Sequence, residues 1–270
     1  MTTARLLQVL RKGWTYGVRL LERPARLPAV LASVVVRGSH LGETLNAARH
    51  AAWLERSGIR TVIDVGTHAG EFASGIRSVL PDCTLYCFEP QPQPFARLEH
   101  RFRRDAAVHA FNIALGSAPG EAVLHQSNFT KASSLLPMAD LHRQAYAWSA
   151  GGSDITVRVD TLDNVLPREV ERAVLLKLDV QGFELEVLRG ASATLARTRY
   201  VLVETSVGGT LYEGEATFGE VHALLVQAGF RYAGVWDQMS DPRTDAPLQI
   251  DALFVRAETA GGSHASTERG

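Results

Sequence analysis

Residues 61–72 read TVIDVGTHAGEF, and this stretch decides the fold. It starts as a short β-branched run, which is typical of a strand buried in a parallel sheet. The strand ends after Asp64, passes through a turn from Gly66 to Gly70, and enters a segment with apolar residues at helical spacing. Glycine adopts unusual dihedrals without a Cβ penalty, so the backbone of such a turn can approach a ligand closely. The stretch predicts the strand, turn and helix N-terminus at which an open α/β sheet holds a nucleotide-like ligand.

The spacing of this turn separates two classes of ligand. A dinucleotide site has the pattern G-x-G-x-x-G, which seats a pyrophosphate on free helix N–H groups. Here Asp64 precedes the first glycine, Thr67, His68 and Ala69 fill the interval, and a third glycine is missing. The Asp64 carboxylate would repel a pyrophosphate but suits the ammonium of an amino acid. The pattern favours S-adenosylmethionine over NAD, and an ordinary tight turn is the alternative.

A second acidic residue strengthens this interpretation. Residues 84–88 form an apolar run that ends at Glu89, followed by Pro90. An acid at the tip of the second strand, about 25 residues after Asp64, is placed to accept the hydrogen bonds of both ribose hydroxyls. The alternative is that Glu89 caps the helix that follows. Two acids at successive strand ends favour the cofactor interpretation.

The composition fits one globular domain without a general affinity for nucleic acid. The 270 residues are 46% hydrophobic and 21% charged, enough to bury a substantial core. The net charge of −1 gives no overall attraction to a polyanion. Residues 1–60 hold ten Lys and Arg against three Asp and Glu, whereas the rest of the chain is acidic. This asymmetry marks the N-terminal segment as a place for a partner.

The two cysteines indicate a reducing compartment. Cys83 and Cys87 are four residues apart on one predicted strand, so their Cα atoms would lie ~13 Å apart, beyond disulfide reach. Free, buried thiols suit the cytoplasm, and no cysteine spacing typical of a metal site occurs. We therefore predict a cytoplasmic protein.

Residues 1–27 predict a basic amphipathic helix. Its apolar face consists of Leu7, Leu10, Trp14, Val18 and Leu21. Such a helix can lie on an anionic membrane surface. The alternative, which we favour, is that it packs on the rest of the domain or on the second copy of a homodimer, with its charges in solvent. Residues 41–58 predict a further helix, so residues 1–60 form a helical N-terminal extension.

From residue 61 onward strands and helices alternate, as a doubly wound sheet requires. The predicted strands are 61–65, 84–89, 108–113, 155–159, 174–180, 200–205, 230–236 and 250–256. The predicted helices lie near 71–80, 91–103, 183–197 and 216–228. No helix separates the last two strands, so they predict an antiparallel hairpin, which is the arrangement of methyltransferases rather than dehydrogenases. The strand at 155–159 is expected to pair with 122–125, and residues 257–270 predict a disordered tail.

These segments, in their order, resemble the FkbM-type family of S-adenosylmethionine-dependent O-methyltransferases. The matching motifs are VIDVG at 62–66 with Gly70, FEP at 88–90, NIALG at 112–116 with Gly120, SSL at 133–135, VDTLD at 159–163, LKLDVQGFE at 176–184 and Glu204. The likeness covers roughly residues 61–235. Two departures stand out: Gln181 replaces a residue that is often acidic in the family, and His68 replaces a small or amide residue.

The resemblance implies a Rossmann-like class I methyltransferase sheet, mostly parallel with one antiparallel strand, over residues 61–256. It also implies a set of cofactor-binding residues, with the methionine end at the first turn, the ribose at the second strand and the adenine at the third. These residues are Asp64, Gly66, Thr67, His68, Gly70, Glu89, Asn112 and Ala114. An amide offers both a donor and an acceptor to an adenine edge, although a turn-capping role explains Asn112 equally well.

The strand at 174–180 carries the candidate catalytic residues. Lys177 and Asp179 are two apart in an otherwise apolar run, so they share one face of the strand. Buried charges are costly unless they are paired or used. Asp179 falls at the carboxyl end, where ligands bind in this architecture, and is our candidate base. The alternative for Lys177 is a structural ion pair with Glu184 or Glu204.

Several roles stay open at this stage. Asp179 could take the proton of an acceptor hydroxyl directly, or it could hold a divalent cation with Glu204 as the second oxygen ligand. His68 could also serve as a base, but a packing or hydrogen-bonding role is more common beside such a turn. Glu184 is a candidate substrate-binding residue, and capping of the helix that it opens is the alternative.

Residues 127–153 interrupt the alternation and would overhang the ligand edge of the sheet. The segment holds the hydroxyls of Ser133 and Ser134, which we predict to bind substrate, and a predicted helix at 136–148 with Tyr146 and Trp148. Aromatic rings stack on sugar faces and hydroxyls recognise sugar hydroxyls, so the segment is interpreted as the acceptor lid. A solvated excursion held together by its own aromatic residues is the alternative.

Three hypotheses of function follow. The first is O-methylation of a hydroxyl on a small-molecule or glycan acceptor, and the family likeness suggests a sugar in a glycolipid, polysaccharide or secondary metabolite. The second is a nucleotide-dependent oxidoreductase, which the glycine spacing disfavours. The third is a non-catalytic scaffold that docks to a membrane or partner through residues 1–27.

Overall fold

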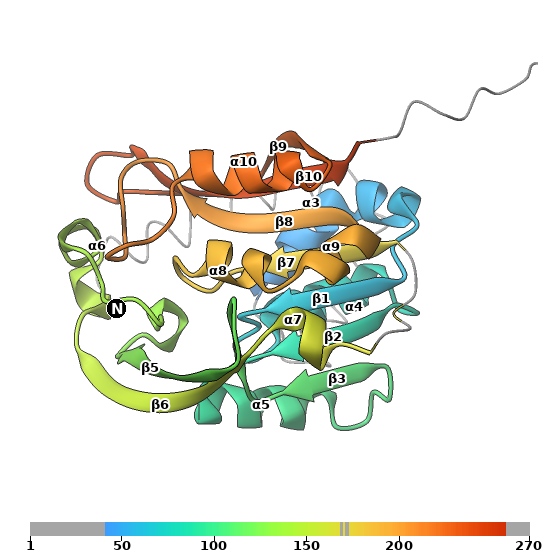
Figure 1. Ribbon diagram of the computed structural model, residues 1–270, viewed down its shortest axis with the longest axis horizontal. Coiled ribbons are helices and arrows are strands. Elements are labelled where there is room, and N and C mark those ends of the chain that lie inside the picture. The colour runs from blue at the N-terminus through green and yellow to red at the C-terminus, as the bar shows by residue number, and fades with distance from the viewer. Residues whose placement is uncertain (1–40, 168–169, 171–172, 258–270) are drawn as a thin grey trace, which may run out of the picture.

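The computed structural model describes residues 41–257, except 168, 169, 171 and 172, and its centre is a seven-stranded sheet in the order β3-β2-β1-β7-β8-β10-β9 (Figure 1). The strands are β1 (Thr61–Val65), β2 (Thr84–Phe88), β3 (Val108–Phe111), β7 (Val174–Leu178), β8 (Thr198–Ser206), β9 (Phe230–Ser240) and β10 (Pro247–Arg256). Neighbouring strands run parallel except at β10, which is antiparallel to both β8 and β9. The predicted doubly wound sheet and its closing hairpin are confirmed.

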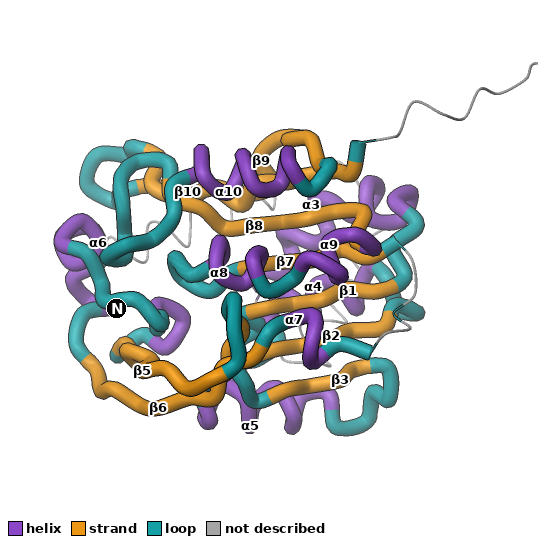
Figure 2. Tube along the Cα trace, viewed as in Figure 1, coloured by secondary structure: helices purple, strands orange, loops and turns teal. Residues whose placement is uncertain are grey.

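Helices cover both faces of this sheet (Figure 2). One face packs against α3 (Leu41–Ser57), α4 (Glu71–Val79) and α5 (Pro92–Phe102), and the other against α7 (Leu162–Val165), α8 (Glu184–Arg189), α9 (Ser192–Arg197) and α10 (Phe218–Gln227). Alternate residues of β1 serve the two layers: Val62 packs with the first set of helices and Ile63 with the second. This two-sided burial explains why the strand is a continuous apolar run.

The single helix predicted at 183–197 is wrong, because the segment forms two short helices. The chain turns between them at Gly190, where an added Cβ would lie 2.1 Å from the carbonyl oxygen of Gly116. The Asp163 carboxylate then accepts hydrogen bonds from the backbone N–H groups of Ala193 and Thr194 (both 2.8 Å). This external cap starts α9 anew, a contact between distant segments that no local pattern reveals.

A small second sheet lies beside the main one. It contains β4 (Ala114–Leu115), β5 (Gly120–Ser127) and β6 (Gly152–Asp160) in the order β4-β6-β5. The antiparallel pairing of β5 and β6 places Ala122 opposite Val157, so the predicted pairing of this segment is confirmed, although β6 is longer than expected. The predicted third strand also ends two residues early, at Phe111.

The connection between β5 and β6 holds only short helical turns. They are η2 (Thr130–Ala132), α6 (Asp140–Ala145) and η3 (Ala147–Ser149). The helix predicted at 136–148 is therefore wrong over most of its length. Tyr146 leaves helical geometry, with φ −132° and ψ 50°, and its hydroxyl donates a hydrogen bond to the carbonyl of Ser240 at 2.8 Å. Helix α6 therefore ends just before Tyr146, whose side chain is hydrogen-bonded to a segment far away in the sequence.

The remaining predicted elements are confirmed within a few residues, including the helix at 41–58, which is α3. The predictions for residues 1–27 and for the tail fall outside the described residues. Within the part of the chain that is described, no helix is long and apolar enough to cross a membrane.

Candidate active site

A cavity of about 500 Å³ opens at the carboxyl ends of β1, β2, β7 and β8, beside the β5–β6 insertion. Many of the residues predicted from the sequence line it: Gly66, Thr67, His68, Glu89, Ala114, Ser133, Ser134, Lys177, Asp179 and Glu204. Four predicted residues do not line it: Asp64, Gly70, Asn112 and Glu184.

Asp64 lies beneath the cavity rather than in its wall. Its side chain is fully buried, the Thr67 hydroxyl donates a 2.6 Å hydrogen bond to Oδ2, and Lys177 Nζ lies 3.6 Å from Oδ1. Burial raises the pKa of Asp64, and the Lys177 charge opposes that shift. In this geometry Asp64 acts on the cavity through Thr67 and Lys177.

The two glycines of the first turn are required by protein packing. Gly66 has φ +80°, and an added Cβ would lie 1.8 Å from the carbonyl oxygen of Asp179. Gly70 has φ +79°, and an added Cβ would lie 2.7 Å from the Phe102 ring and 2.8 Å from Leu98 of α5. The first glycine lets the ends of β1 and β7 approach, and the second lets α5 pack on the start of α4.

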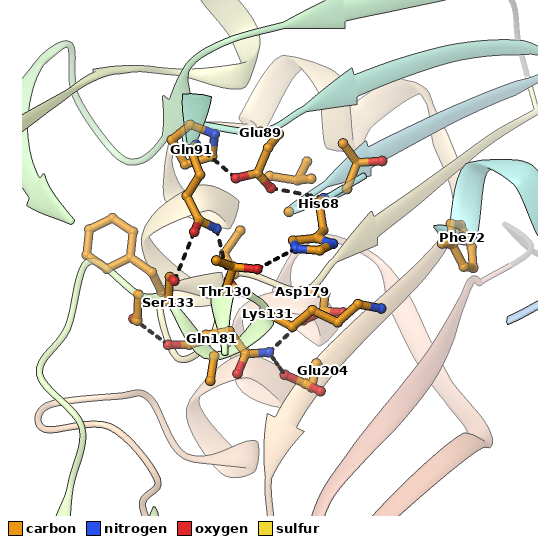
Figure 3. Close-up of a pocket in the computed structure, with 18 of the residues that line it drawn as sticks. His68, Phe72, Glu89, Gln91, Thr130, Lys131, Ser133, Asp179, Gln181 and Glu204 are labelled. Atoms are coloured by element: carbon orange, nitrogen blue, oxygen red, sulfur yellow. Dashed lines mark hydrogen bonds between the residues drawn. The ribbon is translucent and has the colours of Figure 1, made fainter. Parts of the chain in front are cut away.

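Glu89 faces the cavity from the end of β2, with its carboxylate fixed by the backbone (Figure 3). The N–H of His68 donates to Oε2 and the N–H of Gln91 donates to Oε1, both at 2.9 Å. Burial raises the pKa of Glu89, and these backbone donors oppose the shift. Glu89 thus ties the first turn to the second strand while its oxygens border the cavity.

His68 connects the first turn to the insertion. Its backbone is left-handed, with φ 52°, which is uncommon for a residue other than glycine. The ring Nε2 lies 2.9 Å from the Thr130 hydroxyl, and Nδ1 lies 3.2 Å from Glu71 Oε1. Burial would raise the pKa of Glu71, but this contact and the charge of Lys131 lower it to about 2. His68 is engaged at both ring nitrogens, which agrees with the hydrogen-bonding alternative.

One end of the cavity is apolar. Ala114 lies in its wall together with Ile113, Leu115, Leu124 and Phe183. Such walls suit the flat face of a base.

Asn112 stands outside this wall. Its side-chain amide donates to the carbonyls of Glu89 at 2.8 Å and of Pro90 at 3.0 Å, which agrees with the turn-capping alternative. Its predicted contact with adenine stays a prediction.

The opposite end of the cavity is a network of charged and amide side chains (Figure 3). Lys177 Nζ donates to Asp179 Oδ2 at 3.0 Å. Gln181 Nε2 lies 2.7 Å from both Asp179 Oδ1 and Glu204 Oε2. Burial would raise the pKa of Asp179, but the Lys177 charge and these hydrogen bonds lower it below its usual value. Burial and the nearby Asp179 charge raise the pKa of Glu204 well above its usual value. The pKa values of these two neighbouring carboxyl groups are therefore shifted in opposite directions.

The predicted substrate-binding residues are held by the protein itself. Ser133 Oγ donates to Gln91 Oε1 at 3.0 Å, and Ser134 Oγ donates to the carbonyl of Gln181 at 2.6 Å. Glu184 Oε1 accepts the backbone N–H groups of Val180 at 2.9 Å and Gly182 at 3.2 Å. Glu184 thus holds the turn between β7 and α8 rather than capping the helix, because the N–H groups that it accepts lie before the helix begins.

Sequence reasoning missed several cavity residues, of which Gln91, Phe183, Gln249 and Asp251 matter most. A signal existed for two of them. Gln249 and Asp251 are polar residues two apart in an apolar strand, the same pattern that marked Lys177 and Asp179. Gln91 and Phe183 directly follow the recognised motifs or lie within them, but nothing local indicates that they face a cavity.

The alternative with a divalent cation gains no support from the arrangement. Among the residues that the structure describes, no group of three or more His, Cys, Asp or Glu side chains is placed to hold a metal ion. Asp179 and Glu204 are instead bridged by an amide.

Strand order, the single antiparallel strand and a cavity at the carboxyl edge define a class I methyltransferase architecture. A family profile described as "Methyltransferase FkbM domain" matches residues 64–232. The chain belongs to this family, whose members are S-adenosylmethionine-dependent methyltransferases.

Named relatives agree with this assignment. The 2-O-methyltransferase NoeI of Sinorhizobium fredii is 28% identical over 171 residues, covering 61% of this chain and 70% of NoeI. The hexuronic acid methyltransferase AglP of Haloferax volcanii is 29% identical over 147 residues, covering 54% of this chain and 55% of AglP. Among solved structures, a putative methyltransferase from Thermobifida fusca matches 81% of this chain and 82% of its own, with a TM-score of 0.43 and 15% identity.

Proposed function

We propose that this protein binds S-adenosylmethionine in the cavity and transfers its methyl group to a sugar hydroxyl of a glycolipid, polysaccharide or secondary metabolite. The donor is a nucleoside joined to a cationic amino acid. It needs an apolar slot, an acceptor for ribose hydroxyls and negative charge near the sulfonium. The supporting observation is that Glu89 and Asp179, from the ends of β2 and β7, border one cavity. The wall of this cavity around Ala114 is apolar.

The residues present fit this donor. The apolar wall at Ala114 and Phe183 accommodates adenine, and Glu89 offers carboxylate oxygens to the ribose hydroxyls. At the ends of β7 and β8, Asp179 and Glu204 bring two carboxyl groups, joined through Gln181, to the side of the cavity that would face the sulfonium. Gly66, Thr67 and His68 would hold the methionine end through the first turn.

When bound, S-adenosylmethionine supplies a methyl group that is already activated on a sulfonium. The protein therefore contributes mainly position and charge, and correct alignment of the hydroxyl is worth ~7–11 kcal/mol. A positioned base that takes the hydroxyl proton adds about 10²–10⁴ in rate. Asp179 was predicted for this step and remains one candidate.

The insertion supports a sugar as the acceptor. Phe129 and Trp148 line the cavity, with their rings edge to face at 4.8 Å, and Trp148 is 39% exposed. An exposed aromatic ring beside a polar pocket, here that of Trp148, offers a stacking surface for a pyranose. The name of AglP places a sugar acid among the acceptors of a relative. Ser133 and Ser134 remain proposed contacts for sugar hydroxyls.

Calorimetry tests the donor site. S-adenosylhomocysteine should bind one to one, and NAD should not bind. The Glu89→Gln variant should lose about 10–100-fold in affinity, because hydrogen bonds to a charged group are worth ~1.5–3 kcal/mol each. The control is Glu99→Gln, a change at an exposed position of α5. Tight binding of NAD alone would reject the methyltransferase site.

We also propose a cytoplasmic location. For residues 1–27, packing on the domain or on a second copy remains our preferred hypothesis over peripheral membrane contact. Flotation of the full chain with phosphatidylserine vesicles at low salt decides between them, and co-flotation would favour the membrane.

A further inference from the structure

The two carboxyl groups at the ends of β7 and β8 differ in how many of their oxygens are occupied. Asp179 accepts from Lys177 Nζ at Oδ2 (3.0 Å) and from Gln181 Nε2 at Oδ1 (2.7 Å). Glu204 accepts from Gln181 Nε2 (2.7 Å) and Gln249 Nε2 (3.3 Å), both at Oε2. Among the described residues, no donor contacts Glu204 Oε1. One carboxylate is tied at both oxygens, and the other keeps one oxygen for a ligand in the cavity.

Gln181 holds this pair in place. Its backbone is left-handed, with φ 58°, and its carbonyl accepts the Ser134 hydroxyl at 2.6 Å. The Tyr212 hydroxyl lies 2.7 Å from its Oε1, which directs the two N–H bonds of the amide toward Asp179 and Glu204. A non-glycine residue in this conformation persists only where its surroundings hold it. The amide therefore holds Glu204 through its Oε2 atom and leaves Oε1 without a donor among the described residues.

We propose that Glu204 Oε1 takes the proton of the acceptor hydroxyl, while Asp179 serves as a fixed negative charge and Gln181 as the residue that positions both. This assignment rests on the proposed methyl transfer. As the hydroxyl oxygen forms its bond to the methyl carbon, the carbon–sulfur bond breaks and its electron pair stays on sulfur. The hydroxyl proton passes to Glu204 and later to solvent.

The surroundings of Glu204 agree with this role. The charged and titratable groups that face it are Lys177 and Asp179 of β7, Asp251 of β10, Glu184 of α8 and Tyr212. Burial and the Asp179 charge raise its pKa, whereas Lys177 lowers the pKa of Asp179. A base is most effective when its pKa lies near the working pH, so a raised pKa suits Glu204 to this step once the group is ionised, whereas the lowered pKa of Asp179 makes it a weaker base. Burial also raises the pKa of Asp251, to about 8, so Asp251 must be tested beside Glu204.

The first experiment measures methyl transfer from tritiated S-adenosylmethionine to a panel of p-nitrophenyl glycosides. Glu204→Gln keeps the shape of the side chain and should lower kcat by about 10²–10⁴, with affinity for S-adenosylhomocysteine within about threefold of wild type. The matched control is Glu213→Gln, at an exposed carboxylate outside the cavity. Retained kcat in Glu204→Gln would overturn the proposal.

The second experiment needs no acceptor. S-adenosylmethionine carries a sulfonium charge that S-adenosylhomocysteine lacks, so the ratio of their affinities reports negative charge near the methyl group. In wild type the preference for the sulfonium should rise about tenfold as Glu204 ionises with increasing pH. The rise should vanish in Glu204→Gln and persist in Asp251→Asn. The reverse pattern would assign the role to Asp251 and overturn the proposal.

The two arms separate this inference from the proposed function. If neither ligand binds, the donor site itself is wrong. If both ligands bind but no glycoside is methylated, the sugar acceptor is wrong, and the affinity ratios still decide the role of Glu204.

Discussion

At the scale of single residues, Gly66 shows why a motif and its physical cause must be separated. From the sequence motif, we predicted that this glycine lets the backbone approach a ligand closely. In the structure the nearest obstacle to a side chain is the Asp179 carbonyl, 1.8 Å from an added Cβ. The glycine is required because two strand ends meet, and the cavity forms where they meet.

Gly66→Ala should destabilise the protein by at least about 3 kcal/mol, since a left-handed alanine costs ~1–2 kcal/mol and the clash adds to it. Gly214→Ala is the matched control, because Gly214 has φ +78° and an added Cβ would meet nothing within 4 Å. Urea unfolding compares the two. Equal losses would show that the dihedral alone explains Gly66.

At the scale of elements, the turn from β7 into α8 depends on a buried carboxyl group. Glu184 accepts two backbone N–H groups, and burial raises its pKa from 4.5 to about 7. Between pH 4.5 and about pH 7, the Glu184 carboxyl group is protonated to a greater extent in the folded state than in the unfolded state. The contribution of Glu184 to stability is therefore complete below about pH 4.5 and is lost as the pH rises to about 7.

Glu184→Gln keeps an oxygen acceptor and removes this titration. The variant should match wild type near pH 5 and exceed it at pH 8 by up to about 3 kcal/mol, as measured by urea unfolding at each pH. Equal stability of the two proteins at both pH values would contradict this cause.

The elements also show how far sequence reasoning reached. Apolar runs that alternate with helical segments sufficed to predict a mostly parallel sheet covered on both faces, because such runs are typical of strands buried on both faces. The cavity end built by Glu204, Gln249 and Asp251 was only partly visible, since it depends on the antiparallel register that places Asp251 opposite Glu204. The bridge through Gln181 depends on a left-handed backbone that no spacing reveals.

At the scale of the whole molecule, α3 joins the beginning of the described chain to its last hairpin. His50 stacks on Trp236 of β9 with ring centroids 3.5 Å apart, and Trp53 meets Tyr200 and Trp236 edge to face at 4.8 and 5.5 Å. Glu43 and Asn46 of α3 line the cavity. Docking of this helix therefore completes one cavity wall.

Trp53→Ala should lower the free energy of unfolding by about 3 kcal/mol, because the edge-to-face contacts and buried area of a large ring are lost. The control is Val226→Ala, at a side chain that is 47% exposed, with an expected change within about 0.5 kcal/mol. Chemical denaturation followed by circular dichroism measures both. A Trp53 variant as stable as the control would mean that α3 adds little to the fold.

The measurement that tests the central claim most directly is a crystal structure of the full chain with S-adenosylhomocysteine. We expect the ribose hydroxyls on Glu89, the adenine against Ala114 and Phe183, and the sulfur facing Asp179 and Glu204. A ligand bound elsewhere, or bound here with its ribose away from Glu89, would contradict the account.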